Sequence, residues 1–128
     1  MDVGKAEDIQ LRIDGILSVL GNEFDHVINA RIISMRSKNS KARAYARIWS
    51  LPKIWRVALE INPFYVIEVL SENFDNLSED KKIKVLIHEL LHIPKGFSGG
   101  LVPHNSRGIK INSKTVDKVY EIYKNRIK

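Results

Sequence analysis

The sequence contains no cysteine among its 128 residues. This absence excludes a disulfide framework, a thiolate nucleophile and every zinc site that is built from cysteine, and it suits a reducing compartment. Long apolar runs are absent too, since none approaches the ~20 residues that a membrane-spanning helix needs. The polar start, with Asp2, Lys5 and Glu7, differs from a signal peptide. We therefore expect a cytoplasmic protein without a membrane partner, whose chemistry depends on His, Asp, Glu, Lys, Ser or a metal ion.

Glycine and proline are few, at seven and four residues, and the chain has no internal repeat or low-complexity tract. Hydrophobic residues make up 44% and charged residues 28%, which is typical of a folded globular protein. The length suits one compact domain, so we expect a single domain over residues 1–128. The formal net charge of +6 suits an acidic partner such as nucleic acid, but it is also a charge that keeps many small proteins soluble.

Hydrophobic periodicity in the first half of the chain predicts one helix and a small sheet. Apolar residues at helical spacing predict a helix over about residues 5–20. Segments rich in β-branched or alternating residues predict a β-hairpin in which about 26–37 pairs with 42–49. Residues 64–70 form the most strand-like run, and the preceding Pro63 suggests an edge strand. Residues between the hairpin and this strand fit either a short helix or a strand.

The most informative segment is a helix that we expect to begin after Ser78 and to end just after His92. Ser78 is a favourable N-cap, and Pro94 disfavours helical geometry at the residue before it. At 100° per residue one face is apolar, and this face contains Ile83, Leu86, Ile87, Leu90 and Leu91. His88 and His92 lie on the opposite stripe, so one face is expected to be buried while the other presents both imidazoles.

After this helix we expect a glycine-containing loop, a short strand over 108–112 and a last helix capped at Ser113. The order of helix, hairpin, strand, helix, loop and helix does not alternate as it does in doubly wound folds. The predicted fold class is therefore α+β.

Residues His88-Glu89-Leu90-Leu91-His92 match the HExxH pattern. Residues four apart on a helix lie one turn above each other, so two imidazoles can reach one ion. Glu89 is offset by about 100° and can hold a metal-bound water and accept its proton. Paired imidazoles select a borderline metal, most often zinc, and zinc lowers the pKa of bound water to about 7. The motif thus predicts a metal-activated water with Glu89 as the base.

A catalytic zinc needs a third protein ligand and one open position. His104 is the only histidine after the motif, and an acid of the last helix, Asp117 or Glu121, is the alternative. The glycine and the third histidine that a metzincin carries shortly after its motif are absent here, so that class is excluded. His26 is remote from the motif, and we expect a surface or turn histidine there.

Several segments resemble the phage and archaeal metallopeptidase family of HExxH zincins, namely Tyr65–Val69, Phe74–Ser78, Ile87–Pro94, Phe97–Gly100 and Pro103–His104. The resemblance extends over about residues 26–123. More distantly, the order of hairpin, strand, HExxH helix and downstream histidine is similar to SprT-like minimal zincins. Those proteins act on DNA-bound proteins, but this chain has no evident zinc ribbon or strongly basic tail.

The resemblance implies that His88, His92 and His104 bind Zn²⁺ and that Glu89 is the general base. It implies a minimal zincin-like fold, with a small, mostly antiparallel sheet packed on an N-terminal helix and on the HExxH helix, followed by a C-terminal helix. It also implies a zinc-dependent metallopeptidase that acts on a peptide or protein, although the family does not specify the substrate.

From these parts we expect a peptide to pair in extended form with the edge strand at 64–70, because main-chain pairing is how a sheet edge captures a peptide. Glu89 would deprotonate the attacking water and later protonate the leaving amine. A second electrophile would stabilise the oxyanion, and the candidates are Tyr120, Tyr123 and Arg107. The alternative for Tyr120 and Tyr123 is a structural role, since tyrosines at helical spacing are commonly core or cleft-wall residues.

A second hypothesis is a nucleic-acid-associated binding protein with a non-catalytic zinc site. It rests on basic and aromatic residues that would form one surface for single-stranded nucleic acid, namely Lys38, Lys41, Arg43, Tyr45, Arg47, Trp49, Trp55 and Arg56. The alternative for this set is a solvated strand face with its aromatics buried. A carboxylate between the histidines favours the peptidase, since a purely structural site does not need one.

Overall fold

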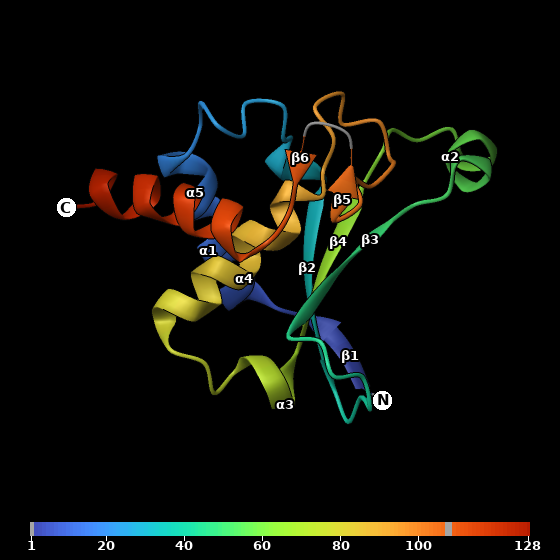
Figure 1. Cartoon of the computed structure of the whole chain (residues 1–128). Coiled ribbons are helices and arrows are strands. Elements are labelled where there is room, and N and C mark those ends of the chain that lie inside the picture. The colour runs from blue at the N-terminus through green and yellow to red at the C-terminus, as the bar shows by residue number, and fades with distance from the viewer. Residues whose placement is uncertain (1, 107–108) are drawn as a thin grey trace.

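The computed structural model describes residues 2–106 and 109–128. The elements are β1 (Asp2–Lys5), α1 (Glu7–Val19), the short 3-10 helix η1 (Asn29–Arg31), β2 (Ile32–Lys38), β3 (Ala46–Ser50), α2 (Lys53–Leu59), β4 (Tyr65–Leu70), α3 (Ser71–Phe74), α4 (Glu79–Leu91), β5 (Asn105–Ser106), β6 (Ile109–Lys110) and α5 (Ser113–Arg126). Helices α1, α4 and α5 gather on one side of the sheet, whereas α2 lies apart from them (Figure 1). The α+β class is confirmed, and the arrangement is consistent with a minimal zincin-like fold.

The main sheet has the strand order β1-β2-β4-β3. β2 and β4 are parallel, while β1 pairs antiparallel with β2 and β3 pairs antiparallel with β4. The predicted hairpin between 26–37 and 42–49 is therefore wrong, because β4 lies between these two strands. The physical reason is burial: Tyr65, Ile67 and Val69 are fully buried, and a strand this apolar is most stable with a partner on each side.

The same topology corrects the position of the edge strand. The sequence predicts residues 64–70 at an edge, but β4 is internal, and the two edge strands of this sheet are β1 and β3. Pro63 precedes the first residue of β4 and so removes no hydrogen bond from the ladder. The edge strand next to β4 is thus β3, Ala46–Ser50, and not residues 64–70.

The N-terminal helix begins at Glu7 rather than near residue 5, because Asp2–Lys5 forms the opposite edge strand β1. All four residues of β1 are exposed, so no alternation of buried and exposed positions marks this strand in the sequence. Helix α1 buries Ile9, Ile13 and Ile16, as its periodicity predicts. The ambiguous segment that follows β3 folds into α2, which has no buried residue.

Helix α4 agrees closely with its prediction. The Ser78 side chain accepts a hydrogen bond from the Lys81 amide at 3.3 Å, which confirms the N-cap. The apolar face is buried in the core together with α1 and β4, and it contains Ile83, Leu86, Ile87 and Leu90. Helix α5 packs on α4, but its N-cap is Asn112 in a capping box with Thr115, one residue before the predicted cap at Ser113.

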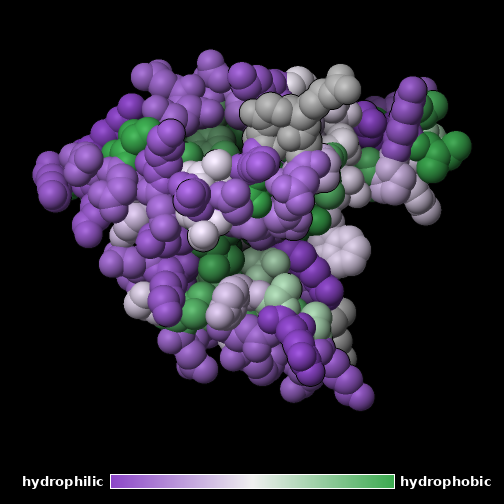
Figure 2. Space-filling model, in the orientation of Figure 1, coloured by the Kyte–Doolittle hydropathy of each residue, from purple (hydrophilic) through white to green (hydrophobic). Residues whose placement is uncertain are grey.

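Within the described ranges, none of the helices has both the length and the apolar character that crossing a bilayer requires. Helix α2 is nevertheless unusually apolar on its outside. Ile54, Trp55, Val57 and Leu59 are each more than half exposed. Figure 2 shows this apolar surface at the end of the molecule where Figure 1 places α2.

Candidate metal centre

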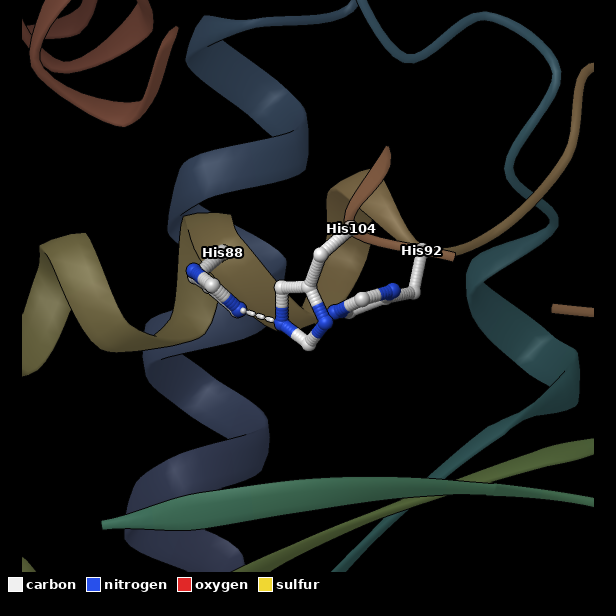
Figure 3. A group of neighbouring side chains, drawn as sticks. All are labelled: His88, His92 and His104. Atoms are coloured by element: carbon white, nitrogen blue, oxygen red, sulfur yellow. Dashed lines mark hydrogen bonds between the residues drawn. The ribbon is translucent and has the colours of Figure 1, made fainter. Parts of the chain in front are cut away.

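Three histidine side chains converge beside the outer stripe of α4. His88 and His92 project from consecutive turns of α4, and His104 reaches them from the loop that leads to β5 (Figure 3). The Nε2 atoms of His88 and His104 lie 3.1 Å apart. One ligand atom from each of the three rings lies within 4.8 Å of the other two. The arrangement follows from helix geometry for the first pair and from the loop for the third ring.

The loop also fixes the ring of His92. The Nδ1 atom of His92 donates a hydrogen bond to the carbonyl oxygen of Val102, and the Val102 amide donates to the carbonyl oxygen of His92 at 2.7 Å. Because Nδ1 carries the proton in this arrangement, the lone pair is on Nε2, which faces the other rings. A carbonyl oxygen behind a histidine is the usual outer partner of a metal ligand.

Burial keeps the imidazoles in the form that binds a metal. Burial, with further contributions from the neighbouring His92 and His104, lowers the pKa of His88 to about 4. Burial also lowers the pKa of His92, although the Val102 carbonyl opposes the change. These two rings are therefore neutral near pH 7, and their lone pairs are free for an ion.

One of the three ligand separations is compatible with a tetrahedral metal site. Tetrahedral zinc with bonds of about 2.0–2.1 Å places two ligand nitrogens about 3.3 Å apart, close to the observed separation of 3.1 Å between His88 and His104. Three imidazoles without a carboxylate form a donor set for a borderline metal rather than for calcium or magnesium.

Glu89 lies next to the histidine cluster but outside its set of ligand atoms. Its side chain is 7% exposed, and no residue in 2–106 or 109–128 donates a hydrogen bond to its carboxylate. Burial raises the pKa of Glu89 to about 8. A cation bound nearby would oppose this rise and favour the carboxylate.

A cleft of about 660 Å³ opens over these residues. One wall is α4, which contributes His88, Glu89 and His92, and the opposite wall is formed by residues 44–48 at the free edge of β3. Leu101, His104 and the first turn of α5 complete the lining. The sequence does not identify the β3 wall, because residues 64–70 have the more strand-like pattern and are predicted at the edge.

The acids of α5 do not join the cluster. Asp117 lines the cleft, but its carboxylate pairs with the Lys84 ammonium at 3.1 Å. Glu121 is exposed and does not line the cleft. Of the three candidates for the third ligand, His104 is the one that the structure brings to His88 and His92.

Of the candidate electrophiles, neither Tyr120 nor Tyr123 lines the cleft. The Tyr120 hydroxyl donates to Asp80 in the first turn of α4, and this bond raises the pKa of Tyr120 to about 12. The ring of Tyr123 packs beside Tyr120 with centroids 6.1 Å apart. Arg107 lies outside the described residues. His26 lies in a turn, as expected, and it is partly buried, with its Nε2 3.2 Å from the Ile93 carbonyl oxygen.

The basic and aromatic residues considered for nucleic-acid binding include exposed aromatic rings and an arginine that is already paired with a carboxylate. Tyr45, Trp49 and Trp55 are each about half exposed, so the expectation of buried aromatics is wrong. Arg47 is engaged at 2.8 Å by Glu68, which also accepts a hydrogen bond from Trp49 Nε1 at 2.8 Å. Burial alone would raise the pKa of Glu68, but these hydrogen bonds lower it, so the Arg47 charge is paired within the fold.

Comparisons with known proteins agree with this geometry. No curated protein and no solved structure gives a significant match to the sequence. One family model, described as "Putative phage metallopeptidase", matches residues 1–124. A metallopeptidase family implies a metal ion, and the three histidines form a group that can hold one. The chain therefore belongs to the phage metallopeptidase family that this model describes.

Proposed function

We propose that this chain is a zinc-dependent metallopeptidase, folded as a single zincin-like domain over residues 1–128. The observation that carries the proposal is the convergence of three imidazoles beside a buried carboxylate, on the wall of a cleft whose other wall is a free strand edge. Each part has a role in peptide hydrolysis, and the family supports that reaction class.

The proposed ligands are His88, His92 and His104, which leave one coordination position for solvent or substrate. When bound there, zinc supplies Lewis-acid chemistry, which polarises a carbonyl group and makes water easier to deprotonate. His88 and His104 bring their Nε2 atoms together, and the Val102 carbonyl orients His92.

Glu89 is the proposed general base and acid. Its carboxylate takes a proton from the attacking water as the water oxygen bonds to the scissile carbonyl carbon. The same proton then passes from Glu89 to the leaving nitrogen as the C–N bond breaks, so the carboxylate is regenerated. The low exposure of Glu89 supports this role, because a dry environment keeps competing water away from the proton.

The substrate is proposed to bind in extended form along β3. The free edge of this strand lines the cleft opposite the histidines, and an edge strand presents unpaired amide and carbonyl groups to an added strand. This proposal replaces the predicted pairing with residues 64–70, which are covered on both sides.

Peptides that carry a single N-methyl group test this binding mode. In a β-pair only alternate residues direct their amides at the partner strand. N-methylation at alternate positions should therefore lower kcat/KM by a factor of about 10, the equivalent of one lost hydrogen bond, while methylation at the positions between them has little effect. An effect that does not alternate along the peptide would contradict pairing with β3.

Metal removal tests the function itself. A chelator should abolish cleavage of a quenched fluorescent peptide library, and one equivalent of Zn²⁺ per chain should restore it. The reason is that both polarisation of the carbonyl group and deprotonation of the water depend on the ion. The measurements are metal content and cleavage rate on the same samples. Cleavage that persists in a metal-free sample, or a chain that binds no zinc, would refute the proposal.

A second candidate is a nucleic-acid-associated protein with a non-catalytic zinc site. The exposed side chains of Tyr45, Trp49 and Trp55 favour it, because exposed aromatics offer stacking surfaces for bases. It would be supported by DNA binding that weakens steeply with salt, in a chain that binds zinc but cleaves no peptide of the library.

A further inference from the structure

The loop between α4 and β5 delivers His104 to the metal centre, and a buried tyrosine holds the middle of this loop. Tyr65 is the first residue of β4 and is 0% exposed. Its hydroxyl accepts a hydrogen bond from the Gly99 amide at 2.9 Å and donates one to the Gly100 carbonyl oxygen at 2.9 Å. One side-chain oxygen thus uses both its donor and its acceptor capacity on two consecutive loop residues.

The loop is shaped to fit this tyrosine. The ring of Phe97 packs edge-on against the ring of Tyr65, with centroids 5.0 Å apart, and Phe97 is itself buried. Gly99 has a φ of +94°, which favours glycine, and the guanidinium of Arg56 from α2 lies over it. A Cβ at Gly99 would stand 2.8 Å from the Arg56 Cζ atom. The Arg56 side chain could move aside for a Cβ, but the positive φ would strain any other residue, so the backbone conformation here favours glycine.

The two hydrogen bonds of Tyr65 with Gly99 and Gly100, here called the clamp, lie only a few residues from the proposed ligands. Two residues after Gly100, the Val102 amide and carbonyl are both bonded to His92, and two residues later His104 enters the cluster. Without the Tyr65 hydroxyl, the Gly99 amide and the Gly100 carbonyl would lose their partners, and conformations that expose them to water would gain population. Many of these conformations would displace Val102 and His104 together.

We infer that Tyr65 is a positioning residue for the metal centre, whose hydroxyl holds the 97–102 loop in the conformation that places His104 and the Val102 carbonyl. The inference rests on the proposed function in one respect, that His104 is a zinc ligand. A site that is assembled before the ion arrives binds more tightly, since the apparent dissociation constant equals the intrinsic one divided by the fraction of competent conformers. The Tyr65 hydroxyl bonds to Gly99 and Gly100 rather than to a ligand ring, so its effect on the ion passes through the loop.

The test is the zinc dissociation constant of the full chain, measured by competition with a chromophoric chelator. Tyr65→Phe removes only the hydroxyl, and we expect its zinc affinity to fall by about 10–100-fold, the range typical of losing an outer partner of a metal site. Hydrogen exchange at the Val102 amide should become faster in the zinc-free protein. The control is Ser34→Ala, which removes another buried hydroxyl, bonded to Gln10, from the neighbouring strand β2.

The outcomes separate the two proposals. If the wild-type chain binds no zinc, the proposed function fails. If it binds zinc and Tyr65→Phe binds equally well, the positioning role is overturned while the function stands. Equal losses in Tyr65→Phe and Ser34→Ala would also overturn it, because the effect would then be a general loss of stability. Gly99→Ala strains the same loop from its other side, so it should weaken zinc binding even if Tyr65→Phe fails to fold, and unchanged affinity in Gly99→Ala would count against the clamp.

Discussion

Glu89→Gln is expected to keep its zinc and to lose peptidase activity by a factor on the order of 10²–10⁴, the contribution typical of a positioned general base. The amide has nearly the shape of the carboxylate but cannot accept a proton from water at neutral pH. Because Glu89 lies outside the set of three ligand atoms, the ion site should be unaffected. The measurements are kcat on a cleavable peptide and zinc content by elemental analysis.

A matched replacement makes this result specific. Glu7→Gln removes an exposed carboxylate in the first turn of α1, outside the cleft, and should leave both activity and zinc content unchanged. If Glu89→Gln retains a real activity, Glu89 is not the base, and the mechanism is wrong even if the metal site is right. If the variant loses its zinc as well, the carboxylate supports the ion rather than the proton transfer.

The parts of the site that could be predicted from sequence are those that depend on local geometry. Helix α4, its N-cap and the shared stripe of His88 and His92 follow from a period of 3.6 residues and from hydrogen bonding within one turn. Glu89 is fixed by its place between the histidines. Placing His104 beside them from sequence relied on elimination and family resemblance, since the loop before it carries no periodic signal.

The sheet order could not be predicted in the same way. Alternation shows which face of a strand is buried but not which strand is its partner. Strands β2 and β4 are neighbours in the sheet although β3 and α2 lie between them in the sequence. Pro63 suggests an edge strand, although a proline before a strand is also compatible with an internal position. The consequence for the proposed function is large, because the strand that we propose for substrate pairing is β3 rather than 64–70.

The positioning role that we infer for Tyr65 also could not be predicted from the sequence. A tyrosine within an apolar strand has the pattern of an ordinary core residue, and nothing in the spacing relates it to Gly99 and Gly100, 34 and 35 residues later. Only the fold brings the start of β4 under the loop. Long-range hydrogen bonds of this kind are therefore where sequence reasoning about a site is least complete.

His104→Ala is expected to reduce zinc affinity by more than the 10–100-fold that loss of an outer partner costs, because it removes one of the three proposed direct ligands. Two imidazoles on one helix would remain, and they leave most of the coordination sphere of the ion to water. His104 is exposed, and its hydrogen bond from the buried Ile111 amide uses the main-chain carbonyl oxygen, which alanine keeps. The variant should therefore fold normally, and circular dichroism checks this point. His26→Ala removes a histidine outside the cluster and should keep one zinc per chain.

Full retention of zinc in His104→Ala would redirect attention to the acids of α5. Asp117 is the better placed of the two, since it lines the cleft, but its pairing with Lys84 would have to break before it reached an ion. Asp117→Asn in the His104→Ala background would then lose the metal, whereas in the wild-type background it should not. Helix α5 packs on α4, whereas His104 follows the loop whose Gly99 and Gly100 are bonded to Tyr65. Comparison of zinc content in these variants therefore distinguishes a third ligand from α5 from a third ligand in the loop.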